Sequence, residues 1–388
     1  KGFRAAGVHA GVKAGSSADK NDLAMILCDT EASAAGVYTM NRVKAAPIYV
    51  TMEHLENGVA RAIVANSGNA NACAPDGMEN ARRMAKAAAD FLGVDEEDVA
   101  VASTGVIGQR INIECIEEHL SEIVLSDDAS EQANRAIMTT DTRTKTAAVE
   151  FTVGGKTCRI GGICKGSGMI HPNMGTMLSF ITTDCAISHE MLTDALQENV
   201  KKTYNRVTVD GDTSTNDMCI VLANGMAGNT LIEWQDEEYQ AFCKALNEIN
   251  TRLARQIAAD GEGATKLVTC TVKNSRSEET AERLAKAVVG SNLVKAAMFG
   301  ADANWGRVLC AMGYSKAPFR PEYVDVAFES ENGSVAVCEK GAALNFDEEL
   351  AKKVLTANEV TIQIDVHEGE HAATAWGCDL TYDYVKIN

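Results

Sequence analysis

Residues 165–184 read Lys165-Gly-Ser-Gly-Met-Ile-His-Pro-Asn-Met-Gly-Thr-Met-Leu-Ser-Phe-Ile-Thr-Thr-Asp184 and join an irregular segment to a short apolar one. Glycine and proline in the first half break any helix or central strand, whereas residues 177–183 have the length and apolarity of a buried strand. A hydroxyl residue at this junction, Thr176, is well placed to be a nucleophile, because the strand fixes it and the loop leaves it accessible. On position alone, a β-branched residue that merely begins a strand is the commoner explanation.

The length and composition are those of a globular protein. With 388 residues, the chain exceeds the size at which one core stops growing, so we expect two domains or one large two-layer domain. A net charge of -18 argues against nucleic-acid and anionic-membrane partners, and the apolar runs are too short to span a bilayer. The twelve cysteines include no Cys-x-x-Cys pair, which favours reduced thiols in a cytoplasm-like compartment. The chain starts without methionine, so targeting is left open.

Strand-like and helix-like segments alternate along the chain, which predicts an α/β protein. A glycine pair between residues 147–153 and 156–164 predicts a hairpin that leads to Lys165. Gly93 supplies a stop signal for the first predicted helix, and Ser188 is a candidate N-cap. The expected strands are residues 23–28, 35–39, 61–65, 99–102, 177–183, 218–223 and 267–272, and the expected helices are residues 76–92, 133–140, 189–202, 237–259 and 278–288.

Two polar loops follow predicted strands. Residues 66–71 suit a tight turn, which fits a solvated turn and a substrate-side loop equally well. In residues 103–108, glycine allows close backbone approach to a ligand, so a backbone N–H and the Thr104 hydroxyl are candidates to stabilise an oxyanion. Spacing alone favours a plain strand-end turn here.

Charged residues in three other loops are candidates for binding. Residues 206–217 place three aspartates close together, but their spacing does not match an EF-hand, and we expect no metal there. Lys165 and Glu262 each lie beside glycines. Taken alone, each reads as an ordinary loop charge.

The segment His367-Glu-Gly-Glu-His371 matches the zinc-protease pattern His-Glu-x-x-His. That pattern binds zinc only on a helix, where residues four apart share a face. Here it follows residues 360–366, which alternate as in a strand, and Gly369 interrupts it. We therefore expect a hairpin turn and no metal.

Lys165-Gly-Ser-Gly-Met-Ile followed by Pro172-Asn-Met-Gly-Thr-Met-Leu resembles the signature of the ornithine acetyltransferases of arginine biosynthesis, the bifunctional glutamate N-acetyltransferases. In that family the precursor cuts itself before the threonine, which becomes the N-terminal nucleophile. The resemblance implies cleavage between Gly175 and Thr176, with Thr176 as nucleophile and Thr104 and Gly105 as the oxyanion hole. The implied substrate-binding residues are Thr142, Lys165, Thr176, Glu262 and Asn388. Whether residues beyond Asn388 complete the substrate site is left open.

The resemblance covers the whole chain and implies an α/β/β/α sandwich like that of the self-processing N-terminal-nucleophile enzymes. It implies an α fragment of residues 1–175 and a β fragment of residues 176–388 with a smaller C-terminal subdomain, assembled as an α2β2 heterotetramer. The implied cytoplasmic enzyme transfers acetyl from N2-acetylornithine to glutamate with no cofactor or metal. Acetyl-CoA as a second donor is left open.

Gly175 and His171 depart from the family, which usually has alanine at both positions. Neither change removes a catalytic group, but Gly175 bears on the rate of self-cleavage and His171 adds a titrating group. Two other functions remain as alternatives. One is a self-processing aminopeptidase or amidohydrolase of the related fold, which usually has a serine nucleophile. The other is a non-catalytic small-molecule-binding protein, which would stay uncut.

Overall fold

The computed structural model describes residues 1–171 and 177–388, which divide into two units. The described part of unit 1 is residues 1–166, 177–205 and 213–253. Unit 2 is residues 167–171, 206–212 and 254–388. The predicted nucleophile Thr176 and its neighbour Gly175 lie outside the described residues.

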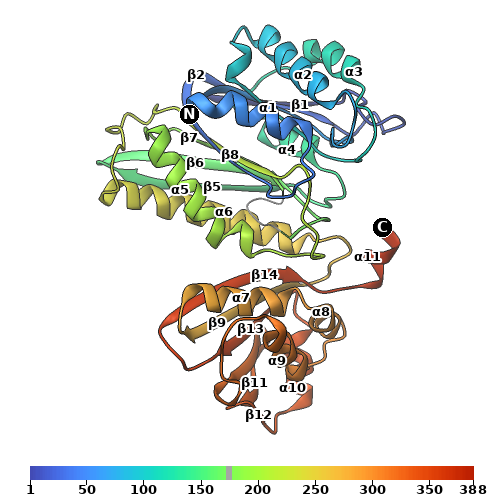
Figure 1. Ribbon diagram of the computed structural model, residues 1–388, viewed down its shortest axis with the longest axis vertical. Helices are drawn as coiled ribbons and strands as arrows, with labels where there is room; N and C mark the ends of the chain where they lie inside the picture. Colours follow the sequence, from blue (N-terminus) through green and yellow to red (C-terminus); the bar gives the residue numbers. More distant parts are fainter. Residues whose placement is uncertain (172–176) are drawn as a thin grey trace. The chain divides into compact units, whose positions relative to one another are not determined.

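Unit 1 contains an eight-stranded mixed sheet with the order β4-β3-β2-β8-β7-β6-β5, and β1 pairs with β2 (Figure 1). The neighbours β3 and β4 are parallel, as are β7 and β8, and the other pairs are antiparallel. β7 therefore lies inside the sheet, between β6 and β8. The strands are β1 Phe3–Val8, β2 Leu23–Tyr38, β3 Val59–Asn66, β4 Val99–Ser103, β5 Lys145–Val153, β6 Lys156–Lys165, β7 Leu178–Thr183 and β8 Met218–Ala223.

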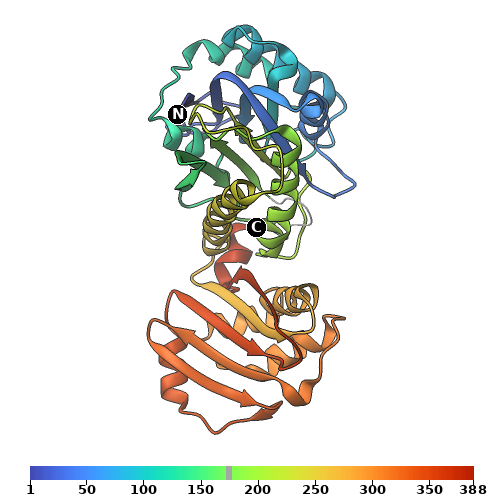
Figure 2. The same ribbon diagram turned by 90° about the vertical axis from the view of Figure 1, so that its left-hand side faces the viewer.

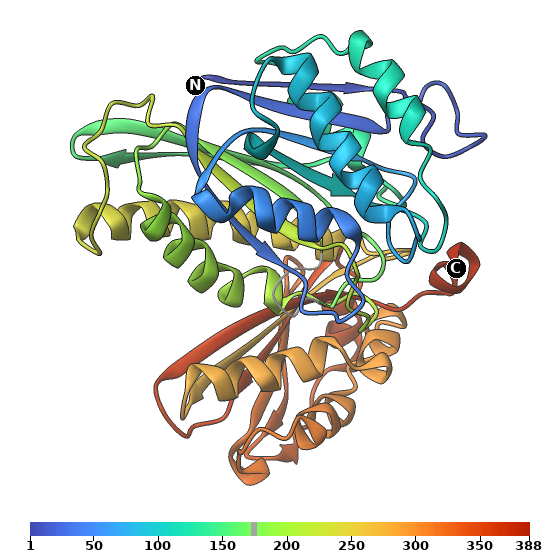
Figure 3. The same cartoon turned by 45° about the horizontal axis from the view of Figure 1, so that its top comes forward.

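Alternate residues of the unit 1 strands enter two different apolar clusters, as a sheet buried on both faces requires. One cluster joins β2, β3 and β4 to α2 and α3, which lie side by side in Figure 3. The other includes α4 and the inner strands β7 and β8. The helices are α1 Ala46–His54, α2 Gly77–Leu92, α3 Ile113–His119, α4 Ser130–Ile137, α5 His189–Lys202 and α6 Glu237–Ala259, whose last residues belong to unit 2.

Unit 2 contains a six-stranded sheet with the order β12-β11-β10-β13-β9-β14, drawn strand beside strand in Figure 2. Its apolar core joins β9, β10 and β13 to α7, α9 and α10. The strands are β9 Leu267–Ser275, β10 Asp325–Ser330, β11 Gly333–Glu339, β12 Ala342–Ala343, β13 Glu359–Asp365 and β14 His371–Cys378. The helices are α7 Glu278–Val289, α8 Asn292–Phe299, α9 Trp305–Tyr314, α10 Glu348–Leu355 and α11 Tyr382–Ile387.

The predicted α/β class is confirmed, and most predicted elements lie within a residue or two of the observed ones. The finer four-layer order and the fragment boundaries of residues 1–175 and 176–388 stay predictions. Gly93 ends α2 in the left-handed conformation (φ 68°). Ser188 caps α5 by accepting a hydrogen bond from the Met191 N–H.

Two details of the predicted elements are wrong. The expected strands 23–28 and 35–39 form one strand, β2, whose polar middle is exposed at a shift in its register with β3. The segment 367–371 is not a hairpin turn, because β13 and β14 lie on opposite sides of β9. It is also not helical, and His367 instead contacts Asp325, with 2.7 Å between Nε2 and Oδ2.

Within the described ranges, no helix is both long enough and apolar enough to cross a membrane.

Candidate active site

The predicted oxyanion residues follow β4, where two polar loops pack together. Ser103 Oγ donates to Asn66 Oδ1 (2.6 Å), and the Thr104 N–H donates to the Asn66 carbonyl (2.9 Å). Asn66 is fully buried, so residues 66–71 are not a solvated turn. The Thr104 N–H is already used in this hydrogen bond, so only the Thr104 hydroxyl can donate to an oxyanion. This hydroxyl has no hydrogen-bond partner among the described residues.

Gly105 allows these loops to approach each other. Its φ of +134° lies in a region that L side chains rarely adopt. A Cβ at this position would lie 2.3 Å from the Gly68 carbonyl carbon and 2.6 Å from the Asn69 nitrogen. The close approach therefore requires glycine at position 105.

Residues 216–218 connect this loop to the beginning of β7. Asn216 Nδ2 donates to the Ser103 carbonyl (2.6 Å), and the Met218 N–H donates to the Met177 carbonyl (2.8 Å). Met177 follows Thr176 in the chain. One short segment thus holds both the residue before Thr104 and the residue after the predicted nucleophile.

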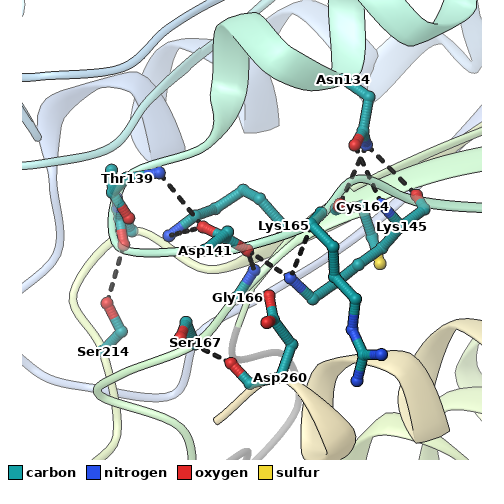
Figure 4. Close-up of polar contacts among 12 residues, drawn as sticks. Asn134, Thr139, Asp141, Lys145, Cys164, Lys165, Gly166, Ser167, Ser214 and Asp260 are labelled. Atoms are coloured by element: carbon teal, nitrogen blue, oxygen red, sulfur yellow. Dashed lines mark hydrogen bonds and ion pairs between the residues drawn. The ribbon is translucent and has the colours of Figure 1, made fainter. Parts of the chain in front are cut away.

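Lys165 ends β6 beside a buried carboxylate. Figure 4 shows Asp141 between the ammonium groups of Lys145 and Lys165, which lie 2.7 Å and 3.9 Å from its oxygens. The side chains of Asp141 and Lys145 are buried, and only 9% of the Lys165 side chain is exposed. Thr142, the next residue after Asp141, is exposed, so the structure places two predicted substrate ligands near one carboxylate.

A second acid, Asp217, lies near Lys165. Burial raises the pKa of Asp217 well above its usual range, although Lys165 and Ser214 act to lower it. Its Oδ2 atom is buried without a partner among the described residues. Burial therefore favours the protonated, uncharged form of the Asp217 carboxyl group.

In unit 2, Glu262 and Asn388 are in contact although 126 residues separate them. Asn388 Nδ2 donates to Glu262 Oε2 (2.8 Å), and the Glu262 N–H donates to the Ser167 carbonyl (3.0 Å). A Cβ on Gly168 would lie 2.3 Å from Glu262 Cδ, so the glycine leaves room for this carboxylate. The hydrogen bond from Ser167 Oγ to the Asp260 carbonyl (2.6 Å), drawn in Figure 4, fixes the same turn.

The segment before Pro172 is held by an aspartate and a threonine of unit 2. The Asp210 carboxylate accepts the N–H groups of Met169 (2.6 Å) and Ile170 (2.9 Å). His171 Nδ1 lies 3.0 Å from Thr208 Oγ1. Burial, with a further contribution from Lys286, lowers the pKa of His171 to about 4, so this histidine is neutral near pH 7.

Sequence reasoning missed Asp141 and did not distinguish the separate contacts of the aspartates in residues 206–217. Asp141 lies in a polar turn in which only Thr142 stood out, and its burial depends on residues of β5 and β6. Asp210 binds backbone N–H groups of unit 2, whereas Asp217 lies near Lys165 in unit 1. The described residues include no cluster of three or more acids, cysteines and histidines suited to a metal ion.

Comparison with known proteins decides the family. The model of the ArgJ family matches residues 4–388. The chain belongs to the ArgJ family. The family predicted from the sequence is confirmed, and with it the expectation of an enzyme of arginine biosynthesis.

ArgJ proteins from several bacteria resemble the whole chain. The arginine biosynthesis bifunctional protein ArgJ of Caldanaerobacter subterraneus subsp. tengcongensis is 51% identical over 391 residues, which cover 100% of this chain and 96% of the relative. The arginine biosynthesis bifunctional protein ArgJ 1 of Clostridium acetobutylicum is 51% identical over 390 residues, covering 100% of this chain and 95% of the relative. A crystal structure of ArgJ from Bacillus halodurans matches with a TM-score of 0.53 and 46% identity, over 55% of this chain and 99% of that one.

Proposed function

We propose that the chain transfers the acetyl group of N2-acetylornithine to glutamate through an acetyl ester on Thr176. Membership of the ArgJ family supports this reaction. The observation that carries the proposal is the link from the Thr104 loop to Met177 through residues 216–218, because acyl transfer needs an oxyanion donor held close to its nucleophile.

Thr176 becomes an N-terminal residue by self-cleavage in this proposal. Its hydroxyl attacks the Gly175 carbonyl, and the amide nitrogen leaves as the α-amine, which gives an ester between the two residues. Water then hydrolyses the ester, releasing a carboxylate on Gly175 and restoring the hydroxyl. Gly175 has no side chain to obstruct this attack.

The α-amine set free by cleavage is the base that the nucleophile needs. An α-amino group has a reference pKa of about 7.7–8.0, so a substantial fraction is neutral at physiological pH. It takes the proton of the Thr176 hydroxyl as the hydroxyl attacks the acetyl carbonyl of the donor. One residue thus supplies both nucleophile and base, as in other N-terminal threonine enzymes.

Transfer takes place in two halves, each with a tetrahedral intermediate. The Thr104 hydroxyl and the backbone at Gly105 stabilise the oxyanion in both halves. Ornithine leaves after the first half, and the amine of glutamate attacks the acetyl ester in the second. Lys165 binds a substrate carboxylate, Glu262 and Asn388 bind a substrate ammonium group, and the exposed Thr142 adds a further contact.

The cut divides the chain into an α fragment of residues 1–175 and a β fragment of residues 176–388. We propose that two copies of each form an α2β2 heterotetramer in the cytoplasm. No cofactor takes part, because Thr176 itself carries the acetyl group. Acetyl-CoA would enter only as an alternative acetyl donor.

Intact mass under denaturing conditions tests self-cleavage first, with wild type beside Thr176→Ala. We expect two wild-type fragments ending at Gly175 and beginning at Thr176, and an uncut variant. The cut protein is then assayed with N2-acetylornithine plus glutamate, with acetyl-CoA plus glutamate, and with peptide amides. A single uncut wild-type chain would contradict the proposal, and hydrolysis of peptide amides without acetyl transfer would favour the aminopeptidase.

A further inference from the structure

Asp141 uses both carboxylate oxygens in the buried cluster of Figure 4. Oδ1 accepts hydrogen bonds from Lys145 Nζ and from the Gly166 N–H, both at 2.7 Å. Oδ2 accepts the Thr139 N–H (3.1 Å) and lies 3.9 Å from Lys165 Nζ. The two lysines therefore relate to Asp141 differently, since Lys145 forms a direct hydrogen bond and Lys165 does not.

The backbone around Lys145 is also fixed. Asn134 Oδ1 accepts the Lys145 N–H (3.0 Å), and Asn134 Nδ2 donates to the carbonyls of Lys145 (3.1 Å) and Cys164 (3.0 Å). Asn134 is fully buried on α4 and thus ties this helix to neighbouring residues of β5 and β6. Lys145 is held in place to bind Asp141.

The charges of this cluster do not cancel. Burial acts to raise the pKa of Asp141, but the charges of Lys165 and Lys145 and the hydrogen bonds from Lys145 and Gly166 lower it to about 2. Asp141 is therefore an anion at neutral pH, whereas burial favours the uncharged form of Asp217. Two ammonium groups beside one carboxylate leave a net charge of about +1, which favours binding of a further anion.

We propose that Asp141 is a positioning residue for substrate recognition. Lys145 holds Asp141 in place by a direct hydrogen bond, and the negative charge of Asp141 orients the Lys165 ammonium group. Lys165 itself stays available to bind a substrate carboxylate. This inference rests on the proposed function, since it assigns the carboxylate of the amino-acid substrate to Lys165. Lys165 Nζ has no hydrogen-bond acceptor among the described residues, so its N–H groups can donate to a substrate carboxylate. By binding the Gly166 N–H, Asp141 also fixes the residue at which the chain leaves β6.

Two substitutions test the inference because they change the charge near Lys165 in opposite directions. The ionisable groups facing Lys165 are Asp141, Lys145, Cys164 and Asp217. Asp141→Asn removes a negative charge from the cluster, so the alkaline limb of kcat/KM should move to lower pH. Lys145→Met removes a positive charge and moves that limb to higher pH. A purely structural defect would not reverse the direction of the shift.

Steady-state kinetics give a second readout. In Asp141→Asn we expect KM for both N2-acetylornithine and glutamate to rise about tenfold or more, with a smaller change in kcat. In Lys145→Met, KM rises as well, because Asp141 then pairs with Lys165 and competes with the substrate. Asp141→Glu should recover part of the affinity, because it restores the negative charge.

Asp184→Asn is the matched control. Its carboxylate is equally buried and accepts a backbone N–H, that of Arg159 (2.7 Å), but it lies beyond the opposite end of β7. We expect its KM values and pH profile to match those of the wild type. An Asp184→Asn profile that shifts like that of Asp141→Asn, or variants of Asp141 and Lys145 that shift in the same direction or not at all, would overturn the inference.

Chemical modification separates this inference from the proposed function. The rate of reductive methylation at Lys165, measured by mass spectrometry across a pH series, reports the charge of the lysine without any assay of acetyl transfer. If the wild type transfers no acetyl group, the proposed function fails. The opposite shifts in Lys165 methylation still decide whether Asp141 sets the charge of that lysine.

Discussion

At the scale of single residues, Gly105 combines an unusual conformation with close packing. Gly105→Ala places a Cβ against the backbone of Gly68 and Asn69 at a φ of +134°. We expect the free energy of unfolding to fall by about 1–3 kcal/mol. The loop must also shift at Thr104, so kcat should fall by about 100-fold or more. Urea denaturation and steady-state kinetics measure the two effects.

Gly108→Ala is the control for conformation without crowding. Gly108 lies in the same loop with a φ of +81°, but a Cβ there would have no heavy atom within 4 Å. Backbone strain should cost about 1–2 kcal/mol, while kcat stays near that of the wild type. Equal losses of kcat in the two variants would show that the loss in Gly105→Ala does not come from the steric clash of its Cβ with the neighbouring loop.

At the scale of elements, Asp379 joins the end of β14 to the beginning of β9. Its carboxylate accepts the N–H groups of Thr265 (2.8 Å) and Lys266 (3.0 Å), and the Thr265 hydroxyl (2.5 Å). Asp379→Ala leaves these donors without a partner, so we expect a loss of about 1–3 kcal/mol in the free energy of unfolding. KM for glutamate should also rise, because Glu262 lies in the loop before Thr265.

Asp379→Asn serves as the comparison, since its amide oxygen can still accept both N–H groups and its NH2 group can donate to the Thr265 hydroxyl. Its loss of stability should be less than half that of the alanine variant. Similar losses in the two variants would mean that charge, rather than hydrogen bonding, holds β14 to β9.

The spacing of apolar residues is enough to predict those elements whose bounds are marked by residues within the segment itself, such as an N-cap. α5 and α6 were placed correctly, because an N-cap or a long amphipathic repeat is contained in the segment itself. The polar middle of β2 resembles a turn and so predicts two strands, whereas β3 pairs with β2 on both sides of that middle. Likewise, the partner β9 that separates β13 from β14 lies about a hundred residues away in sequence.

Some residues of the candidate site can be predicted from the sequence, and others depend on tertiary packing. Thr176, Lys165 and Glu262 could be named because they lie in motifs that resemble a family. Neither the burial of Asp141 nor its contact with Lys145 follows from a turn sequence, since both depend on how α4, β5 and β6 pack. The burial of Asn66 was equally hidden, because a polar loop reads as solvated unless a second loop covers it.

At the scale of the whole molecule, the two proposed fragments share one sheet. β1 to β6 come from residues 1–175, whereas β7 and β8 come from residues 176–388, and β8 pairs with β2 while β7 pairs with β6. We expect the fragments to co-purify without denaturant after cleavage. Each fragment expressed alone should be unfolded or aggregated, as circular dichroism and light scattering would measure, because its strands lack their partners.

Co-expression of the two segments as separate chains is the control, with the second beginning at Thr176 after removal of the initiating methionine. If the shared sheet decides folding, the co-expressed pair should be soluble. A folded, monomeric fragment of residues 1–175 on its own would contradict this expectation.

The interior position of β7 has a consequence for the order of the refolding reaction. The uncut precursor refolds as a single chain, at a rate that does not depend on its concentration. After the proposed cut, the same sheet can form again only when two molecules meet, so refolding becomes second order and competes with aggregation of unpaired strands. The uncut precursor would then unfold reversibly, whereas the lifetime of the mature protein would be set by its rate of unfolding and dissociation.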